Sequence, residues 1–203
     1  LNYIPYSIPK HKIIDGISFI DINNRLYRLK IFGDHNLQNI SGALNICKAL
    51  GVESEDFYNA ITSFNGASNR LELVYKSSDT IIFKDFAHSP SKVKATTEAV
   101  HKQFPNRKLI SFFELHTYSS LNPLFLEKYR DTLKHSDECY IYYSEKNMRI
   151  KRLEPIDSEL ITRSFNHSSL TVIDNYEKLN KKIYDLDLSN SVLLMMSSGK
   201  FGG

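Results

Sequence analysis

From residue 71 to residue 196, short stretches of apolar and β-branched residues alternate with segments whose apolar residues recur at helical spacing. Such alternation favours a mostly parallel sheet with helices on both faces, because a parallel crossover needs a connection about the length of a helix. We therefore predict an α/β, Rossmann-like domain here. The expected strands are 71–75, 80–83, 108–113, 138–143, 169–173 and 191–196, and the expected helices are 89–101, 123–133 and 176–184.

The chain before residue 66 has a different pattern. Apolar residues over 12–32 are interrupted by Asp15-Gly16 and Asn23-Asn24, which are hairpin signals. Two amphipathic helices should follow, the first ended by Gly51 and the second capped by Ser54 and reaching Phe64. These features predict antiparallel hairpins and two helices, with a domain boundary near residues 65–69.

Composition gives no reason to expect two classes of partner, nucleic acid and membranes. The formal net charge of +3 permits an anionic small molecule but gives no reason to expect nucleic acid. No apolar run reaches the roughly 20 residues that a membrane helix needs, so we expect no membrane partner. The chain starts at Leu1 without an initiator Met, and we expect it to be a piece of a longer protein.

Polar clusters follow three of the expected strands. In open α/β sheets, ligands bind at the carboxyl ends of the strands, so these clusters should share one rim and form the site. The clusters are Asp85-Phe86-Ala87-His88, Glu114-Leu115-His116-Thr117-Tyr118 and Ser197-Ser198-Gly199-Lys200-Phe201-Gly202-Gly203.

Each candidate residue has a functional and a structural interpretation. The side chains of His35, Asn36 and Asn39 could face a flat heterocycle, or could simply belong to a capped helix start. Arg70 could bind phosphate through its forked guanidinium, or could form a salt bridge with Glu72.

The same choice applies after the strands. Asp85 could accept hydrogen bonds from a ribose, or could order its own turn. His88 could bind an anion, or could cap the following helix. His116 lies in a segment that is either part of the site or a plain polar loop.

The order of these motifs along the chain resembles the Mur ligase family, from about Gly33 to the end. Members carry a GxHNxxN helix start, an RxE-type linker and a D-[YF]-A-H-x-P turn in that succession. Residues 113–119 and 196–203 are similar to the branch that uses UDP-N-acetylmuramate. The ending, residues 196–203, is similar to the murein tripeptide ligases more than to the L-alanine-adding ligases. The family's motifs are matched by Gly33-Asp34-His35-Asn36-Leu37-Gln38-Asn39, Arg70-Leu71-Glu72 and Asp85-Phe86-Ala87-His88-Ser89-Pro90.

The resemblance implies a cytoplasmic, ATP-dependent ligase of peptidoglycan biosynthesis or recycling. Residues 1–66 would be the tail of the α/β ATP-binding central domain and 67–203 the carboxy-terminal domain. The chain has no GxxxxGK[ST] P-loop, so by itself it should be inactive. The expected small-molecule substrates are ATP with Mg²⁺, UDP-N-acetylmuramate and an amino acid or peptide, joined through an acyl phosphate.

By the same resemblance, individual residues acquire roles. Side chains of the helix start would lie against the adenine, Arg70 would reach the phosphates and Asp85 would hold the ribose. His88 and His116 would face the reaction centre as catalytic residues. No metal ligand is assigned. The adenine residues would be His35, Asn36 and Asn39.

Three departures leave the function open. Asn69, Ser89 and Ser120 stand where relatives have Arg, His and, in the alanine-adding branch, Arg. The primary hypothesis is a ligase that takes the L-Ala-γ-D-Glu-meso-diaminopimelate tripeptide. The alternatives are a UDP-N-acetylmuramate–L-alanine ligase, a non-catalytic Mur-like nucleotide-binding module and an unrelated Rossmann-like binder.

Overall fold

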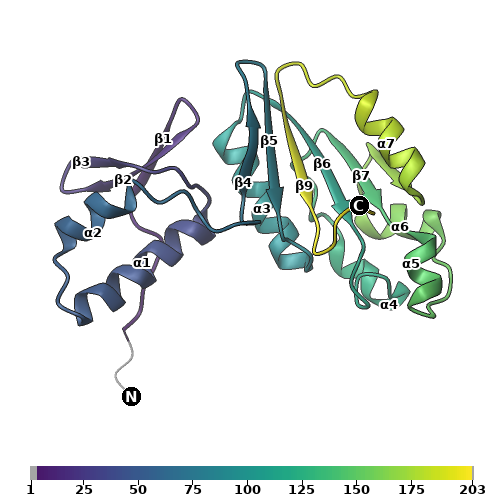
Figure 1. The fold of residues 1–203 in the computed structure, drawn as a ribbon, viewed down its shortest axis with the longest axis horizontal. Coiled ribbons are helices and arrows are strands. Elements are labelled where there is room, and N and C mark those ends of the chain that lie inside the picture. The colour runs from purple at the N-terminus through teal and green to yellow at the C-terminus, as the bar shows by residue number, and fades with distance from the viewer. Residues whose placement is uncertain (1–3, 203) are drawn as a thin grey trace. The chain divides into compact units, whose positions relative to one another are not determined.

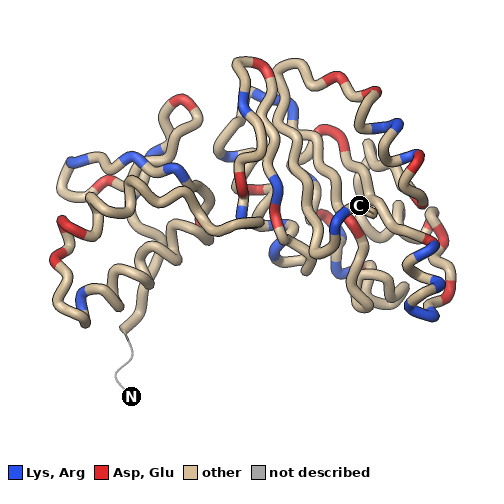
Figure 2. The backbone as a smooth tube through the Cα atoms, in the orientation of Figure 1, with Lys and Arg blue, Asp and Glu red and all other residues tan. Residues whose placement is uncertain are grey.

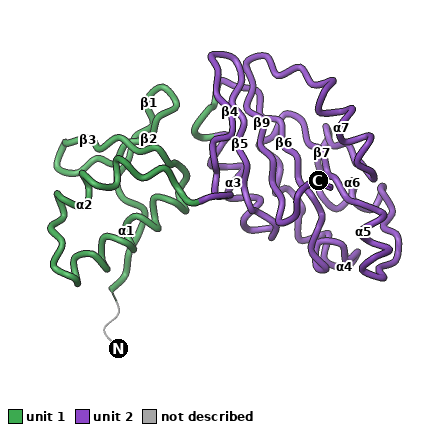
Figure 3. Tube along the Cα trace, in the orientation of Figure 1, with its two compact units in different colours: residues 1–67, 102–105 green, residues 68–101, 106–203 purple. Residues whose placement is uncertain are grey.

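The computed structural model describes residues 4–202 and divides them into two compact units (Figures 1 and 3). The first unit runs up to Ala67 and includes Lys102–Pro105, and the second comprises Ser68–His101 and the chain from Asn106 onwards. The division lies one residue from the predicted boundary between 66 and 67. Which domains of the family the units represent stays a prediction.

The predicted hairpins of the first unit are confirmed. Strands β1 (His11–Ile14), β2 (Ile17–Ile22) and β3 (Arg25–Arg28) form an antiparallel sheet in that order. Asp15 and Gly16 have φ of 50° and 71°, and Asn23 and Asn24 have 51° and 66°. Two consecutive positive φ angles match the right-handed twist of paired strands, which explains these dipeptides.

Two helices pack on this sheet. Helix α1 (Asp34–Ala49) ends before Gly51, whose φ of 84° makes it the expected terminating glycine. Helix α2 spans Ser54–Ile61, so Ser54 is its first residue; the predicted capping role was wrong, because Glu53 takes the cap position without a side-chain bond. The helix also stops before Phe64, which is exposed. The buried core of the unit is Ile20, Tyr27, Leu29, Leu37, Ile40, Phe57 and Tyr58.

The second unit is built on a six-stranded sheet with the order β4-β5-β9-β6-β7-β8. The pair β4–β5 is antiparallel and every other neighbouring pair is parallel, which confirms the mostly parallel sheet. Strand β9 returns between β5 and β6, so the described residues that follow Met196 leave the sheet from its middle. The strands are β4 (Glu72–Lys76), β5 (Thr80–Asp85), β6 (Lys108–Glu114), β7 (Glu138–Tyr142), β8 (Leu170–Ile173) and β9 (Ser191–Met196).

The helices of this unit only partly follow the prediction. Helices α3 (Pro90–Gln103) and α7 (Tyr176–Tyr184) lie where expected. The predicted helix 123–133 stops early as α4 (Pro123–Leu126) and a 3₁₀ turn (Glu127–Tyr129). Asp131 then takes a φ of 59° and bonds to Asn166, so tertiary contacts end the helix. Helices α5 (Glu145–Ile150) and α6 (Ser158–Phe165) were not predicted.

Helices cover both faces of the sheet, as predicted (Figure 1). The neighbours Phe112 and Phe113 are both 0% exposed and point to opposite faces, since side chains alternate along a strand. Phe112 stacks on Tyr140 in the cluster that contains Leu179 of α7. Phe113 contacts Tyr129 and Phe165 of the 3₁₀ turn and α6. The two aromatic layers hold the rim in place from both sides.

Among the described residues, no helix is both long and apolar enough to cross a membrane.

Candidate functional site

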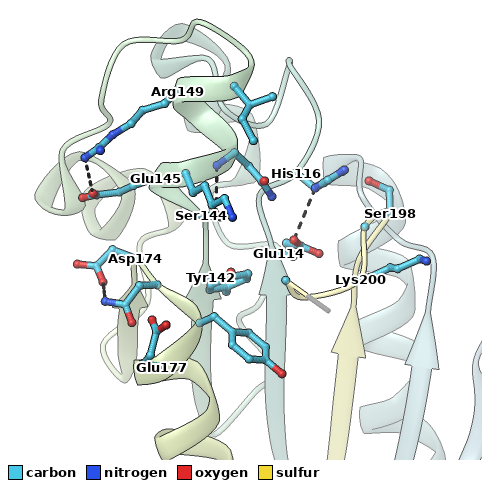
Figure 4. A pocket seen from close by; sticks show the side chains of 17 residues that line it. Glu114, His116, Tyr142, Ser144, Glu145, Arg149, Asp174, Glu177, Ser198 and Lys200 are labelled. Atoms are coloured by element: carbon cyan, nitrogen blue, oxygen red, sulfur yellow. Dashed lines mark hydrogen bonds and ion pairs between the residues drawn. The ribbon is translucent and has the colours of Figure 1, made fainter.

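A pocket of about 1260 Å³ opens at the carboxyl ends of β6, β7, β8 and β9 (Figure 4). The connections after all four strands contribute to it, as expected for an α/β sheet. Glu114 and Tyr142, which are register partners on β6 and β7, lie on its wall. Two of the three polar clusters in the sequence, those after β6 and β9, therefore meet here.

Glu114 is the central contact of the pocket wall. Its side chain is 2% exposed, and its Oε2 accepts hydrogen bonds from the Ser197 hydroxyl and, at 3.0 Å, from the Phe201 backbone N–H. The Ser197 Oγ in turn accepts from the Gly199 N–H at 2.7 Å. One buried carboxylate thus folds the segment after β9 back over the end of β6.

Gly199 makes this fold sterically feasible. A Cβ atom there would lie 2.7 Å from His116 Nδ1 and 2.8 Å from Glu114 Oε2, which is closer than real contacts allow. Gly202 is similar: its φ is 88°, and a Cβ would lie 2.9 Å from the Tyr142 hydroxyl. The glycines of the terminal run are therefore needed for close packing, and Gly203 lies outside the described residues.

Side chains of both signs line the rest of the pocket. The elements α5 and α7 carry basic and acidic residues along the chain (Figure 2). Arg149 pairs with Glu145 at 3.6 Å, and both side chains are more than half exposed. The pocket can therefore receive a ligand that carries both ammonium and carboxylate groups. Its charged lining, besides Glu114 and His116, is Glu145, Lys146, Arg149, Asp174, Glu177 and Lys200.

Tyr142 provides a neutral polar surface at the base. Burial raises the pKa of its phenol, so the hydroxyl stays protonated at neutral pH. The Phe201 ring stacks on it with centroids 6.1 Å apart.

The third polar cluster forms the turn after β5. The Asp85 carboxylate is 3% exposed and accepts from the N–H groups of Leu71 at 2.8 Å and Ala87 at 2.7 Å, and from the Thr96 hydroxyl at 3.3 Å. These contacts favour the turn-ordering interpretation; a bond from Asp85 to a ribose stays a prediction. The Asp85 carbonyl accepts from Ser197 N–H at 3.0 Å, which joins this turn to the segment after β9.

Replacing Asp85 by Asn should destabilise the second unit by about 1–3 kcal/mol, because the amide would point a donor at a buried backbone N–H. Urea unfolding followed by circular dichroism would measure the loss. Glu154, which is exposed, gives the control Glu154→Gln, expected to change stability by less than ~0.5 kcal/mol. An equally small change in Asp85→Asn would show that the turn does not need the carboxylate.

Arg70 and His88 both lie against the ring of Phe86. The Arg70 guanidinium carbon is 5.6 Å from the Phe86 centroid, and the His88 ring meets Phe86 edge-on at 5.2 Å. His88 Nδ1 is 2.9 Å from the Phe86 carbonyl, so it does not cap α3, and the buried Tyr129 hydroxyl donates to the His88 carbonyl at 2.6 Å. Glu72 instead pairs with Lys84, not with Arg70 as the alternative supposed. This arrangement fits an anionic group such as a phosphate.

The predicted adenine residues lie in the first unit, on the first turns of α1. Asn36 donates to the Phe32 carbonyl at 2.9 Å and is half-buried, as is His35, while Asn39 is exposed. Asn39 is accessible for a ligand, and Asn36 keeps its amide oxygen as a further acceptor. Their contact with adenine stays a prediction.

Sequence reasoning missed the pocket residues outside the polar clusters. Lys146, Arg149, Asp174 and Glu177 were left unassigned, although each follows an expected strand within a few residues. The signal that could have found Lys146 and Arg149 is Ser144, which caps α5 by accepting from Asn147 N–H.

Among residues 4–202, no group of three or more His, Cys, Asp or Glu side chains could hold a metal ion.

The chain is similar to known proteins both in sequence and in fold. No model of a protein family matches the chain. The UDP-N-acetylmuramate–L-alanine ligase of Lactobacillus delbrueckii subsp. bulgaricus is 31% identical over 115 residues, which are 57% of this chain and 26% of that protein. The chain thus spans about a quarter of the length of this curated relative.

Solved structures share the fold, among them two ligases. The UDP-N-acetylmuramate–alanine ligase of Thermotoga maritima superposes with a TM-score of 0.75 at 16% identity, covering 97% of this chain and 43% of that one. A murein peptide ligase of Psychrobacter arcticus superposes with a TM-score of 0.60 at 20% identity, covering 94% and 41%. The ordered motifs and this sequence match support a relationship to the Mur ligase family, and the shared fold agrees with it.

Proposed function

We propose that the whole protein is an ATP-dependent ligase that joins the L-Ala-γ-D-Glu-meso-diaminopimelate tripeptide to UDP-N-acetylmuramate in peptidoglycan recycling. The pocket of the second unit would receive the incoming amine. The observation that carries this proposal is the pocket itself, whose volume and charge pattern suit a multiply charged peptide.

The size of the pocket favours a peptide over a single small amino acid. Its volume of about 1260 Å³ exceeds the roughly 300–1000 Å³ of ordinary ligand sites, which already hold drug-sized molecules. The tripeptide carries both amino and carboxylate groups, and cationic and anionic side chains line the pocket. L-Alanine would leave most of this surface without a partner.

Ser120 supports the same substrate. It stands where the alanine-adding ligases have Arg, and here it is 1% exposed, with its hydroxyl donating to the Thr117 carbonyl at 3.0 Å. A buried hydroxyl within a tight turn cannot replace a guanidinium as the anchor of a free amino-acid carboxylate.

L-Alanine remains the second candidate substrate. The observation that favours it is the name of the curated relative and the higher TM-score of the alanine ligase structure. Both likenesses cover less than half of the other protein's length.

ATP is the expected energy source by the family resemblance. Arg70 presents guanidinium donors beside the exposed Phe86 ring, where they could hold nucleotide phosphates and offset their charge, and His88 lies against the same ring. Asp85, as the residue that shapes this turn, would set the position of His88.

The deciding experiment is phosphate release by the full-length protein with ATP, Mg²⁺ and UDP-N-acetylmuramate, offered either the tripeptide or L-alanine. We expect turnover with the tripeptide alone. Turnover with L-alanine alone would assign the second candidate, and no turnover with either would favour the non-catalytic alternative.

Arg149→Gln should raise the tripeptide KM by about tenfold, because a charge-assisted hydrogen bond contributes ~1.5–3 kcal/mol and 1.4 kcal/mol is a factor of ten. Arg152→Gln, on an exposed residue outside the pocket lining, is the matched control and should leave the KM unchanged. Equal effects of the two variants would remove Arg149 from the proposed site.

A further inference from the structure

The Glu114 carboxylate faces Nδ1 of His116, whose partly exposed side chain lines the pocket. Glu114 Oε1 lies 3.6 Å from His116 Nδ1, while its Oε2 is occupied by Ser197 and Phe201. We propose that Glu114 is a positioning residue that fixes the tautomer of His116, so that Nε2 takes a proton from the incoming ammonium group. The proton transfer in this inference rests on the proposed function, whereas the tautomer of His116 rests on the position of Glu114 alone.

The tautomer follows from the donor and acceptor roles of the two groups. An ionised carboxylate only accepts hydrogen bonds, so the ring nitrogen that faces it is favoured in its protonated form. The hydrogen on Nδ1 leaves the lone pair of the neutral ring on Nε2. His116 lines the pocket and its side chain is 35% exposed, so a ligand can reach the ring (Figure 4).

Burial gives Glu114 a fixed orientation. Its side chain is 2% exposed, and the two bonds on Oε2 prevent the carboxylate from turning away. At 3.6 Å the pair is longer than a hydrogen bond, but it becomes an ion pair as soon as the imidazole is protonated. The carboxylate would thus stabilise the imidazolium that proton transfer creates.

The proposed reaction needs such an acceptor. A peptide α-amino group has a pKa of about 8 and is mostly ammonium at neutral pH. One proton passes from the ammonium to His116 Nε2, which frees the nitrogen lone pair to attack the acyl carbon. The bond between that carbon and the phosphate oxygen then breaks, and the leaving phosphate takes the second proton of the nitrogen.

Other charged groups face the pocket from every connection around His116. The neutral phenol of Tyr142, on β7, also lines the pocket. The charged groups include both cations and anions. The carboxylate of Glu114 is the one that forms an ion pair with His116 within the described part of the chain. The remaining charged groups are Glu145, Lys146 and Arg149 from α5, Asp174 and Glu177 from the β8–α7 connection, and Lys200 from the segment after β9.

Glu114→Gln separates positioning from a purely structural role. The glutamine oxygen can still accept from Ser197 and Phe201, so the segment after β9 stays folded. Its amide NH₂ would then face Nδ1 and donate to it, which favours the opposite tautomer with hydrogen on Nε2. Glu127→Gln removes an equal charge from an exposed side chain and serves as the matched control.

The first readout is the tautomer itself, measured by long-range ¹H–¹⁵N NMR of the His116 ring in this chain. We expect hydrogen on Nδ1 in the native protein and in Glu127→Gln, and hydrogen on Nε2 in Glu114→Gln. A native His116 with hydrogen on Nε2, or a Glu114→Gln variant with the native tautomer, would overturn the inference whatever the protein catalyses.

The second readout is the pH profile of tripeptide turnover by the full-length enzyme. Positioned bases contribute about 10²–10⁴-fold, so Glu114→Gln should lower kcat by at least ~100-fold at pH 7 and by much less at pH 9, where free amine is abundant. A loss equal at both pH values would contradict the proton-transfer role. Absence of turnover in the native enzyme would refute the proposed function and with it this chemistry, while the NMR result would still decide the tautomer.

Discussion

Replacing Gly199 by Ala should lower tripeptide turnover by about 100-fold while the sheet stays folded. The added Cβ would lie 2.7 Å from His116 Nδ1 and 2.8 Å from Glu114 Oε2, so either the imidazole or the segment after β9 must move. A displacement of about 1 Å at a reacting group can cost ~100-fold in rate. Steady-state kinetics of the full-length enzyme, with circular dichroism of the chain, would measure both parts of the prediction.

The matched control is Gly51→Ala. A Cβ at Gly51 would meet nothing within 4 Å, although the φ of 84° makes alanine unfavourable there. This variant should lose about 1 kcal/mol of stability through its backbone and keep its turnover. If Gly199→Ala also kept its turnover, the close contact with His116 would have no role in the reaction.

Phe113→Ala should destabilise the second unit by about 3–5 kcal/mol, the largest stability loss expected here. The ring is 0% exposed and packs between Tyr129, with centroids 5.3 Å apart, and Phe165, at 6.1 Å. Its removal leaves a cavity beneath the 3₁₀ turn, whose Tyr129 hydroxyl supports the His88 carbonyl. Chemical unfolding monitored by tyrosine fluorescence would report the loss.

Leu124→Ala is the control for this substitution. Leu124 is 92% exposed, so its truncation should change stability by less than ~0.5 kcal/mol. A loss below about 1 kcal/mol in Phe113→Ala would mean that the face of the sheet beneath α6 is not closely packed.

Local sequence determined most of the elements of this fold. The Asp15-Gly16 and Asn23-Asn24 turns follow from backbone preferences alone, since few residues adopt two successive positive φ angles. The strands of the parallel sheet are equally visible, because a strand covered on both faces must be apolar along its length. The expected positions of the strand ends also predicted that Asp85, Glu114 and the residues after Met196 lie on one rim of the sheet.

Only the tertiary structure decided how those side chains are used. Asp85 turns inward to three donors, one of which belongs to Leu71, fourteen residues away. The segment 123–133 has helical periodicity, yet the helix ends early because Asp131 bonds to Asn166 and Tyr129 packs on Phe165. Contacts between residues far apart in sequence outweigh local propensity there.

The same distinction holds for the pocket. The sequence identifies His116 and the terminal glycines as candidates, because both follow strands whose carboxyl ends share one rim. It cannot specify that Gly199 must lie against His116 and Glu114, since that contact joins β6 and β9 across 83 or more residues. Distances of this kind depend on strand order and register, which are settled only when the whole sheet has assembled.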